Sequence, residues 1–137
     1  MTTLVIDASV ALAWCFPDEA NDDADAVLDA LAGKSGLVPA IWALEVANAL
    51  LVGERARRLG PPEIRRFTSL LENLSIFQDV LSTSQYVDHV LPLAREYGLS
   101  AYDAAYLELA IRQGTSLATL DRKLRIAAQK AGIQVFA

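Results

Sequence analysis

Short apolar runs, several of them rich in β-branched residues, alternate with longer helix-like segments along the whole chain. Runs of this length are typical of buried strands, and their alternation with helices indicates a parallel sheet covered on both faces. The expected strands are residues 3–6, 36–39, 75–80, 116–120 and 134–136. We therefore predict a three-layer α/β/α sandwich with a short central parallel sheet.

The helix boundaries follow from the spacing of apolar residues and from proline and glycine. Pro17 stops the first helix and Gly33 closes the second. Pro92 lies inside the fifth helix, where it removes one backbone donor. The expected helices are residues 8–14, 20–31, 41–58, 63–74, 83–97, 100–113 and 122–131.

The composition excludes several classes of protein. With 137 residues, of which 53% are hydrophobic, the chain is expected to form one domain over residues 1–137 rather than to be disordered. No stretch approaches the roughly eighteen apolar residues of a membrane helix, and the first residues do not resemble a secretory signal. Cys15 is the only cysteine and His89 the only histidine, which excludes an intramolecular disulfide and a structural zinc site. We expect a cytoplasmic protein without a membrane segment.

The formal net charge of −5 is unusual for a nucleic-acid-binding domain. Six of the acids lie within residues 18–29, where we expect a solvated surface. Four others are candidate site residues: Asp7, Glu45, Asp103 and Asp121. Setting aside those four changes the formal net charge from −5 to −1. Basic residues cluster at 55–58 with 65–66, and at 122–125. The charge therefore permits an RNA substrate without indicating one.

Asp7 and Asp121 each follow a predicted strand directly and precede a helix. Each would serve as an N-cap, which stabilises a helix by about 1 kcal/mol. The ligand sites of parallel sheets also lie beyond the carboxyl ends of the strands, so two aspartates at two such ends can share one site. The sequence leaves both interpretations open.

Asp103 lies on the same helical face as Tyr106, on the side that is expected to face inward. Ser100 precedes it by three residues in a spacing that would also suit a capping arrangement. Glu108 and Arg112 form a favourable i,i+4 pair that we expect to face solvent. A carboxylate on the inward face needs hydrogen bonds or a cation to compensate its burial.

Glu45 lies in the apolar helix 41–52, and none of its neighbours one turn away is a cation. Either its stem extends to solvent or its carboxylate points into a polar cleft that holds a metal. Together, the four acids would repel one another unless a cation binds them. Oxygen ligands select hard ions such as Mg²⁺ or Mn²⁺, and such ions assist the hydrolysis of phosphate esters.

Three polar residues are weaker candidates for supporting roles. Ser9 and Thr119 lie two positions from Asp7 and Asp121, and their hydroxyls suit either a turn or the orientation of a carboxylate. Asn48 lies one helical turn after Glu45. His89 is expected at the surface or in packing, and four aromatic residues are expected in the core: Trp14, Trp42, Tyr102 and Tyr106.

The chain resembles the PIN-domain family, and within it the VapC-type toxin ribonucleases of type II toxin–antitoxin pairs. The matching segments are residues 5–9, 39–50, 99–106 and 118–121, in family order and spread over nearly the whole chain. The resemblance implies an endoribonuclease that depends on Mg²⁺ or Mn²⁺, with Asp7, Glu45, Asp103 and Asp121 as its catalytic and metal-binding acids. It also implies a homodimer that a small cognate antitoxin inhibits by covering the active site.

We expect Asp7 and Asp103 to bind the metal directly, and Glu45 and Asp121 to act through water or a second ion. Some relatives carry another acid shortly after the fourth aspartate. Here Arg122 and Lys123 follow it, which does not favour a fully occupied second metal site.

Three other functions remain as alternatives to this one. The first is a PIN-type nuclease of RNA processing that has no antitoxin. The second is a signalling receiver domain, which would carry paired acids after the first strand and a lysine after a late strand; this chain has only Asp7 at the first place and Leu120 and Asp121 at the second. The third is a non-catalytic interaction module in which the acids are helix caps.

Overall fold

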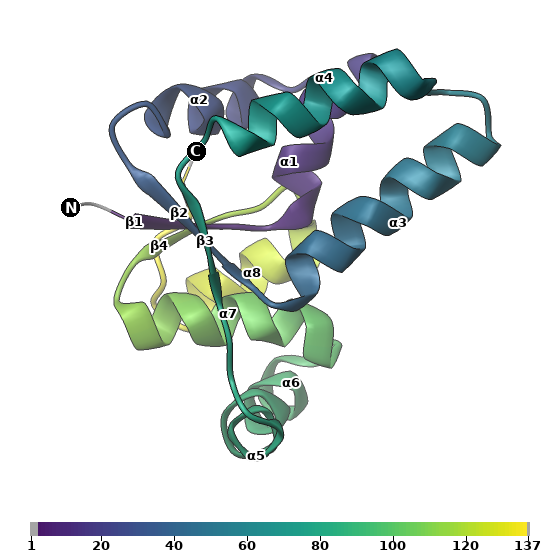
Figure 1. Cartoon of the computed structure of the whole chain (residues 1–137). Helices are drawn as coiled ribbons and strands as arrows, with labels where there is room; N and C mark the ends of the chain where they lie inside the picture. The colour runs from purple at the N-terminus through teal and green to yellow at the C-terminus, as the bar shows by residue number, and fades with distance from the viewer. Residues whose placement is uncertain (1–2, 137) are drawn as a thin grey trace.

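The computed structural model describes residues 3–136, which form a four-stranded parallel sheet (Figure 1). The strands are β1 Thr3–Ile6, β2 Ser35–Pro39, β3 Ile76–Asp79 and β4 Ser116–Ala118, and they lie in the order β3-β2-β1-β4. Strand β1 pairs with both of its neighbours: Leu4 lies opposite Gly36 of β2, and Val5 lies opposite Leu117 of β4. The predicted parallel sheet is confirmed.

Two groups of helices enclose the sheet. The chain moves from β1 to β2 to β3 in one direction and then returns past both strands to β4. Because crossovers between parallel strands are right-handed, this reversal places the helices before β3 and those before β4 on opposite faces. In Figure 1, α1, α2 and α4 lie above the strands, and α7 and α8 lie below them. The helices are α1 Ala8–Cys15, α2 Asp22–Ala30, α3 Ile41–Arg55, α4 Pro61–Glu72, α5 Thr83–Gln85, α6 Leu91–Tyr97, α7 Ala101–Gln113 and α8 Arg122–Lys130, with a 3₁₀ turn η1 Pro17–Glu19 and a π-helical segment η2 Tyr86–Val90. The predicted three-layer sandwich is confirmed.

The predicted helix over residues 83–97 has an irregular middle. The segment η2 separates α5 from α6, and the backbone N–H of Leu91 donates to the carbonyl of Tyr86, five residues earlier. Pro92 follows immediately, inside the first turn of α6. Proline lacks a backbone donor and crowds the preceding turn, so the wider π turn accommodates it where a regular helix would not.

The strand predicted over residues 134–136 is reduced to a single bridge. Val135 lies opposite Leu117 in a parallel bridge, and the backbone of Leu117 exchanges hydrogen bonds with Gln134 and Phe136. The segment follows the turn after α8 and reaches the edge of β4, which is itself only three residues long. A strand that short leaves no room for a longer ladder.

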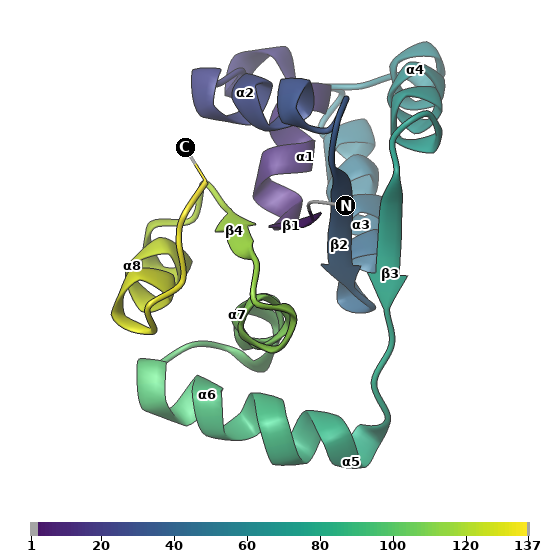
Figure 2. The same ribbon diagram turned by 90° about the vertical axis from the view of Figure 1, so that its left-hand side faces the viewer.

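Helix α7 occupies the centre of the molecule. It contacts β1, β2 and β4 on one side and α6 and α8 on others, and Figure 2 shows it end-on between these elements. All residues from 104 to 110 are buried, including Glu108, so the prediction that Glu108 faces solvent is wrong. The predicted pair with Arg112 is confirmed, with Nε 2.9 Å from a carboxylate oxygen, and Arg112 also binds Asp79 at the end of β3. Because Glu108 lies in this buried stretch, its carboxylate requires a partner such as Arg112.

The ends of α7 are fixed by local signals. The Ser100 hydroxyl accepts a hydrogen bond from the backbone of Asp103 at 3.1 Å, which caps the first turn. Gly114 ends the helix with φ +62°, a left-handed conformation that glycine adopts without strain. The helix is therefore capped three residues before Asp103. Over residues 3–136, we find no helix with the length and apolar character needed to cross a membrane.

Candidate active site

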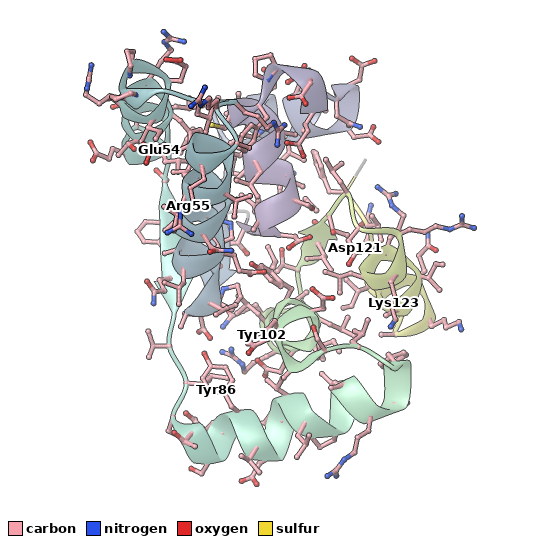
Figure 3. All side chains as sticks on the ribbon, turned by 90° about the vertical axis from the view of Figure 1, so that its right-hand side faces the viewer. Glu54, Arg55, Tyr86, Tyr102, Asp121 and Lys123 are labelled. Carbon is pink, nitrogen blue, oxygen red and sulfur yellow. The ribbon has the colours of Figure 1, made fainter. Side chains whose placement is uncertain are left out.

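Four acidic residues from distant parts of the chain approach one another beside the carboxyl ends of two neighbouring strands. Asp7 follows β1, Asp121 follows β4, Glu45 lies in α3, and Asp103 lies in the first turn of α7. Figure 3 looks onto the N-terminal end of α7, with α3 on one side and Asp121 with α8 on the other. The chain reverses its direction across the sheet between β1 and β4, which is the position where open α/β sheets bind ligands.

Asp7 is the most buried of the four, with 6% of its surface exposed. It occupies the N-cap position of α1 but makes no side-chain capping bond, so the interpretation of Asp7 as a helix cap is wrong. Instead, its Oδ2 accepts hydrogen bonds from the Ser9 hydroxyl at 2.8 Å and the Thr119 hydroxyl at 2.7 Å. Burial raises the pKa of Asp7, the two hydroxyls oppose this rise, and the charge of Asp121 adds to it.

Asp121 does cap a helix. Its Oδ1 accepts a hydrogen bond of 3.1 Å from the backbone of Lys123 at the start of α8. Its own backbone N–H donates to the Thr119 hydroxyl at 3.0 Å, and that hydroxyl donates to Asp7. Thr119 therefore links the two aspartates that follow β4 and β1. Capping uses one oxygen of Asp121 and is compatible with a second role for this carboxylate.

Asp103 and Glu45 are half-buried and face the same region. Burial raises the pKa of Asp103, and the charges of Asp121 and Asp7 raise it further, while Lys123 opposes them. Burial likewise raises the pKa of Glu45, the charges of Asp7 and Asp103 add to this, and a hydrogen bond from Tyr106 lowers it. Each carboxylate thus senses at least one of the others as a neighbouring negative charge.

The arrangement suits a divalent cation in its chemistry. Every candidate ligand is a carboxylate oxygen, and oxygen ligands favour hard ions such as Mg²⁺ and Mn²⁺. Lys123 lowers the pKa of Asp103 and so opposes part of the repulsion that Asp121 and Asp7 exert on this carboxylate. Within residues 3–136, no three acidic, histidine or cysteine side chains already converge closely enough to hold one ion. The residues therefore fit a metal in type and charge, and binding would draw them closer together.

The supporting and aromatic candidates behave differently from one another. Ser9 and Thr119 both contact Asp7, whereas Asn48 is exposed on α3 and its side chain makes no hydrogen bond among the described residues.

Tyr102 is 62% exposed, so the prediction that it lies in the core is wrong. Its position in the first turn of α7 explains this, because the buried part of the helix is residues 104–110.

Sequence reasoning assigned Tyr106 to the core and missed its contact with the acids. Tyr106 has no exposed surface, as predicted, but its hydroxyl donates to Oε1 of Glu45 at 2.5 Å. The available signal was its spacing of three residues from Asp103, which places both on one helical face. That spacing does not reveal the partner, since Glu45 lies 61 residues earlier in the chain.

The raised pKa values predict how stability depends on pH without metal. Asp7, Glu45 and Asp103 hold their protons more tightly in the native state than in the unfolded chain, where the ordinary values are 3.8, 4.5 and 3.8. The native state therefore carries more protons above pH 4, and the free energy of unfolding falls as pH rises through the raised pKa values. Urea unfolding between pH 4 and pH 8 in a chelator measures this slope. Asp7→Asn should flatten it, and an unchanged slope would contradict the raised pKa of Asp7.

Comparison with known proteins identifies the family. The family model described as PIN domain matches residues 4–130. The chain is 35% identical over 124 residues to Ribonuclease VapC3 from Pyrobaculum aerophilum, covering 88% of this chain and 91% of that protein. Among solved structures, PAE2754 from Pyrobaculum aerophilum is 24% identical with a TM-score of 0.72, covering 98% of this chain and 84% of that one. A toxin–antitoxin complex from Klebsiella pneumoniae is 18% identical with a TM-score of 0.59, covering 86% of each chain. These two structures support the fold. The family model and the similarity to VapC3 together show that this chain belongs to the PIN-domain family.

Proposed function

We propose that this protein is a metal-dependent endoribonuclease that hydrolyses phosphodiester bonds of RNA and acts as the toxin of a toxin–antitoxin pair. The observation that carries the proposal is that Asp7, Glu45, Asp103 and Asp121 lie near enough to influence one another's charge, at the point where the chain reverses across the sheet. Similarity to a ribonuclease over 88% of the chain supports the choice of substrate.

The four carboxylates would hold Mg²⁺ or Mn²⁺, with Asp7 and Asp103 as direct ligands and Glu45 and Asp121 acting through water or a second ion. A cation bound there supplies Lewis acidity for the attack of water on phosphorus and neutralises charge on the phosphate oxygens. Ser9 and Thr119 fix the orientation of the Asp7 carboxylate by donating to the same oxygen. Asn48 is exposed on α3, one helical turn after Glu45, where a bound nucleotide can reach it.

The two basic clusters differ in their relation to this site. Arg58 of the first cluster is already paired with Asp18 at 2.8 Å and Glu19 at 3.0 Å. Arg122 and Lys123 of the second cluster are exposed at the start of α8, directly after Asp121. We propose that this second cluster contacts the RNA phosphates, which position a nucleic acid without specifying its sequence.

The proposed partners are a second copy of the chain and a small antitoxin that covers the active site. An apolar groove of about 500 Å³ lies between the start of α3, η2 and the start of α7. Val87 and Tyr102, which line it, are 52% and 62% exposed. Exposed apolar surface of this kind marks sites of protein association and supports partners on this face. In this proposal the partners and the RNA are all cytoplasmic.

Expression of the protein alone tests this function. We expect growth to arrest, because RNA is cut, and co-expression of the small protein encoded beside it to relieve the arrest. Sequencing of RNA 5′ ends after brief induction should reveal new ends that are absent when Asp7→Asn is induced. Unaffected growth under strong expression of folded protein, together with cleavage of RNA in vitro, would favour a processing nuclease without antitoxin.

A further inference from the structure

Tyr106 is a polar residue in a fully buried position next to the acids. It has no exposed surface, it lies in the central helix α7, and its hydroxyl donates to Oε1 of Glu45 at 2.5 Å. A buried phenol needs a hydrogen-bond partner, and Glu45 is the acceptor that the described residues provide. The bond joins α7 to α3 across 61 residues of sequence.

From this contact we infer that Tyr106 is a positioning residue, which holds the Glu45 carboxylate in place for a divalent cation. The inference rests on the proposed function, because it concerns the metal that the four acids would bind. Tyr106 would touch neither the cation nor the RNA, and would act only through Glu45.

The geometry favours such a role because the Tyr106 ring is immobilised by packing, whereas the Glu45 side chain is not. Glu45 is half-buried, and among the described residues its carboxylate receives a hydrogen bond from Tyr106 alone. Without that bond its three side-chain torsions would be free to carry the carboxylate toward solvent. The Tyr106 ring is immobilised in the core, and burial together with Glu45 and Asp7 raises the pKa of its hydroxyl, which therefore stays a donor.

Tyr106 also sets the relation between two acids of the proposed metal site. Asp103 lies one helical turn before it on α7, and both ends of that helix are fixed by Ser100 and Gly114. A bond from Tyr106 to Glu45 therefore holds the acid of α3 at a defined place relative to the acid of α7. Only one oxygen of Glu45 is engaged, which leaves Oε2 available to water at the metal or to a second ion.

The opposing explanation is that Glu45 serves merely to satisfy the buried hydroxyl. In that case Tyr106→Phe would lower stability and leave metal binding unchanged. The two explanations are separated by titrating the metal-free, full-length protein with Mn²⁺ and following the free ion by electron paramagnetic resonance. The same variants are then assayed for kcat and KM on RNA, and for thermal unfolding.

We expect Tyr106→Phe to fold, since it keeps the ring, and to raise the Mn²⁺ dissociation constant by about 10- to 100-fold, the range for losing an outer partner of a metal ligand. At fixed Mn²⁺, kcat should fall while KM for RNA stays unchanged. Tyr97→Phe removes the same atom from a half-buried tyrosine of α6, and Leu109→Val perturbs the buried face of α7 itself. Both controls should bind Mn²⁺ as the wild type does.

A double-mutant cycle gives the decisive result. If Tyr106 acts through Glu45, adding Tyr106→Phe to Glu45→Gln should change the Mn²⁺ dissociation constant by less than about twofold, because the two effects share one path. Wild-type Mn²⁺ affinity in Tyr106→Phe, an undiminished effect in the Glu45→Gln background, or an equal loss in Leu109→Val would each overturn the inference. If those results accompany wild-type Mn²⁺ binding and RNA cleavage, the proposed function stands. Absence of both activities from the wild type would overturn the function and the inference together.

Discussion

We expect Asp7→Asn and Asp103→Asn each to reduce RNA cleavage by more than about 100-fold. Each removes a proposed direct metal ligand, and loss of a residue that only orients a ligand already costs about 10- to 100-fold. The fold should survive. In Asp7→Asn the amide oxygen can take the place of Oδ2 and accept the same two hydroxyl hydrogen bonds, and the substitution removes a buried charge. Cleavage of a defined RNA by purified protein, with circular dichroism of each variant, measures both effects.

Asp25→Asn is the matched control for these variants. Asp25 is exposed on α2, within the acidic stretch of residues 18–29, so the change removes the same charge from a helix that carries none of the four acids. It should cut RNA at the wild-type rate. An Asp103→Asn protein that remains folded and cuts the same RNA as fast as wild type would remove Asp103 from the proposed site.

Mn²⁺ should stabilise the wild-type protein without any substrate. A ligand that binds only the native state stabilises it by about 2.7 kcal/mol at a hundred times its dissociation constant. For a chain of this length each kcal/mol corresponds to about 4 °C, so the midpoint of thermal unfolding should rise by about 10 °C. Mg²⁺ should require a higher concentration, because it gives up its water reluctantly. Differential scanning calorimetry with and without each ion provides the measurement.

Asp103→Asn should change two properties together in this experiment. It should raise the midpoint of the metal-free protein, because it removes a charge that Asp121 and Asp7 repel, and it should diminish the shift caused by Mn²⁺. Asp25→Asn should keep the full shift. Glu108→Gln is unsuitable as a control, since Glu108 is buried and paired with Arg112. Absence of a Mn²⁺ shift in the wild type, or its loss in Asp25→Asn alone, would favour the interaction module over the nuclease.

Local patterns in the sequence determined the four strands, their parallel direction and the positions of two acids. Strand length, β-branched residues and the alternation with helices are short-range signals, and they predicted β1, β2, β3 and β4 within a few residues. Once Asp7 and Asp121 are placed directly after strands, the parallel arrangement itself brings them to the same edge of the sheet. Helical periodicity then sufficed to turn Asp103 inward.

Contacts between distant segments were decided only by the tertiary structure. Periodicity gives the direction of a side chain relative to its own helix, but not how many neighbours the helix has. Helix α7 is covered by the sheet, α6 and α8, so Glu108 is buried although it lies on the face that the pattern assigned to solvent. For the same reason the partner of Tyr106 was not predictable, because Glu45 is brought to it by the packing of α3. Whether Asp7 caps a helix or accepts from Ser9 and Thr119 also depended on where β4 ends. The sequence by itself determined which acids approach one edge of the sheet, and the tertiary structure decided which side chains orient them, since hydrogen bonds depend on atomic positions that no local pattern defines.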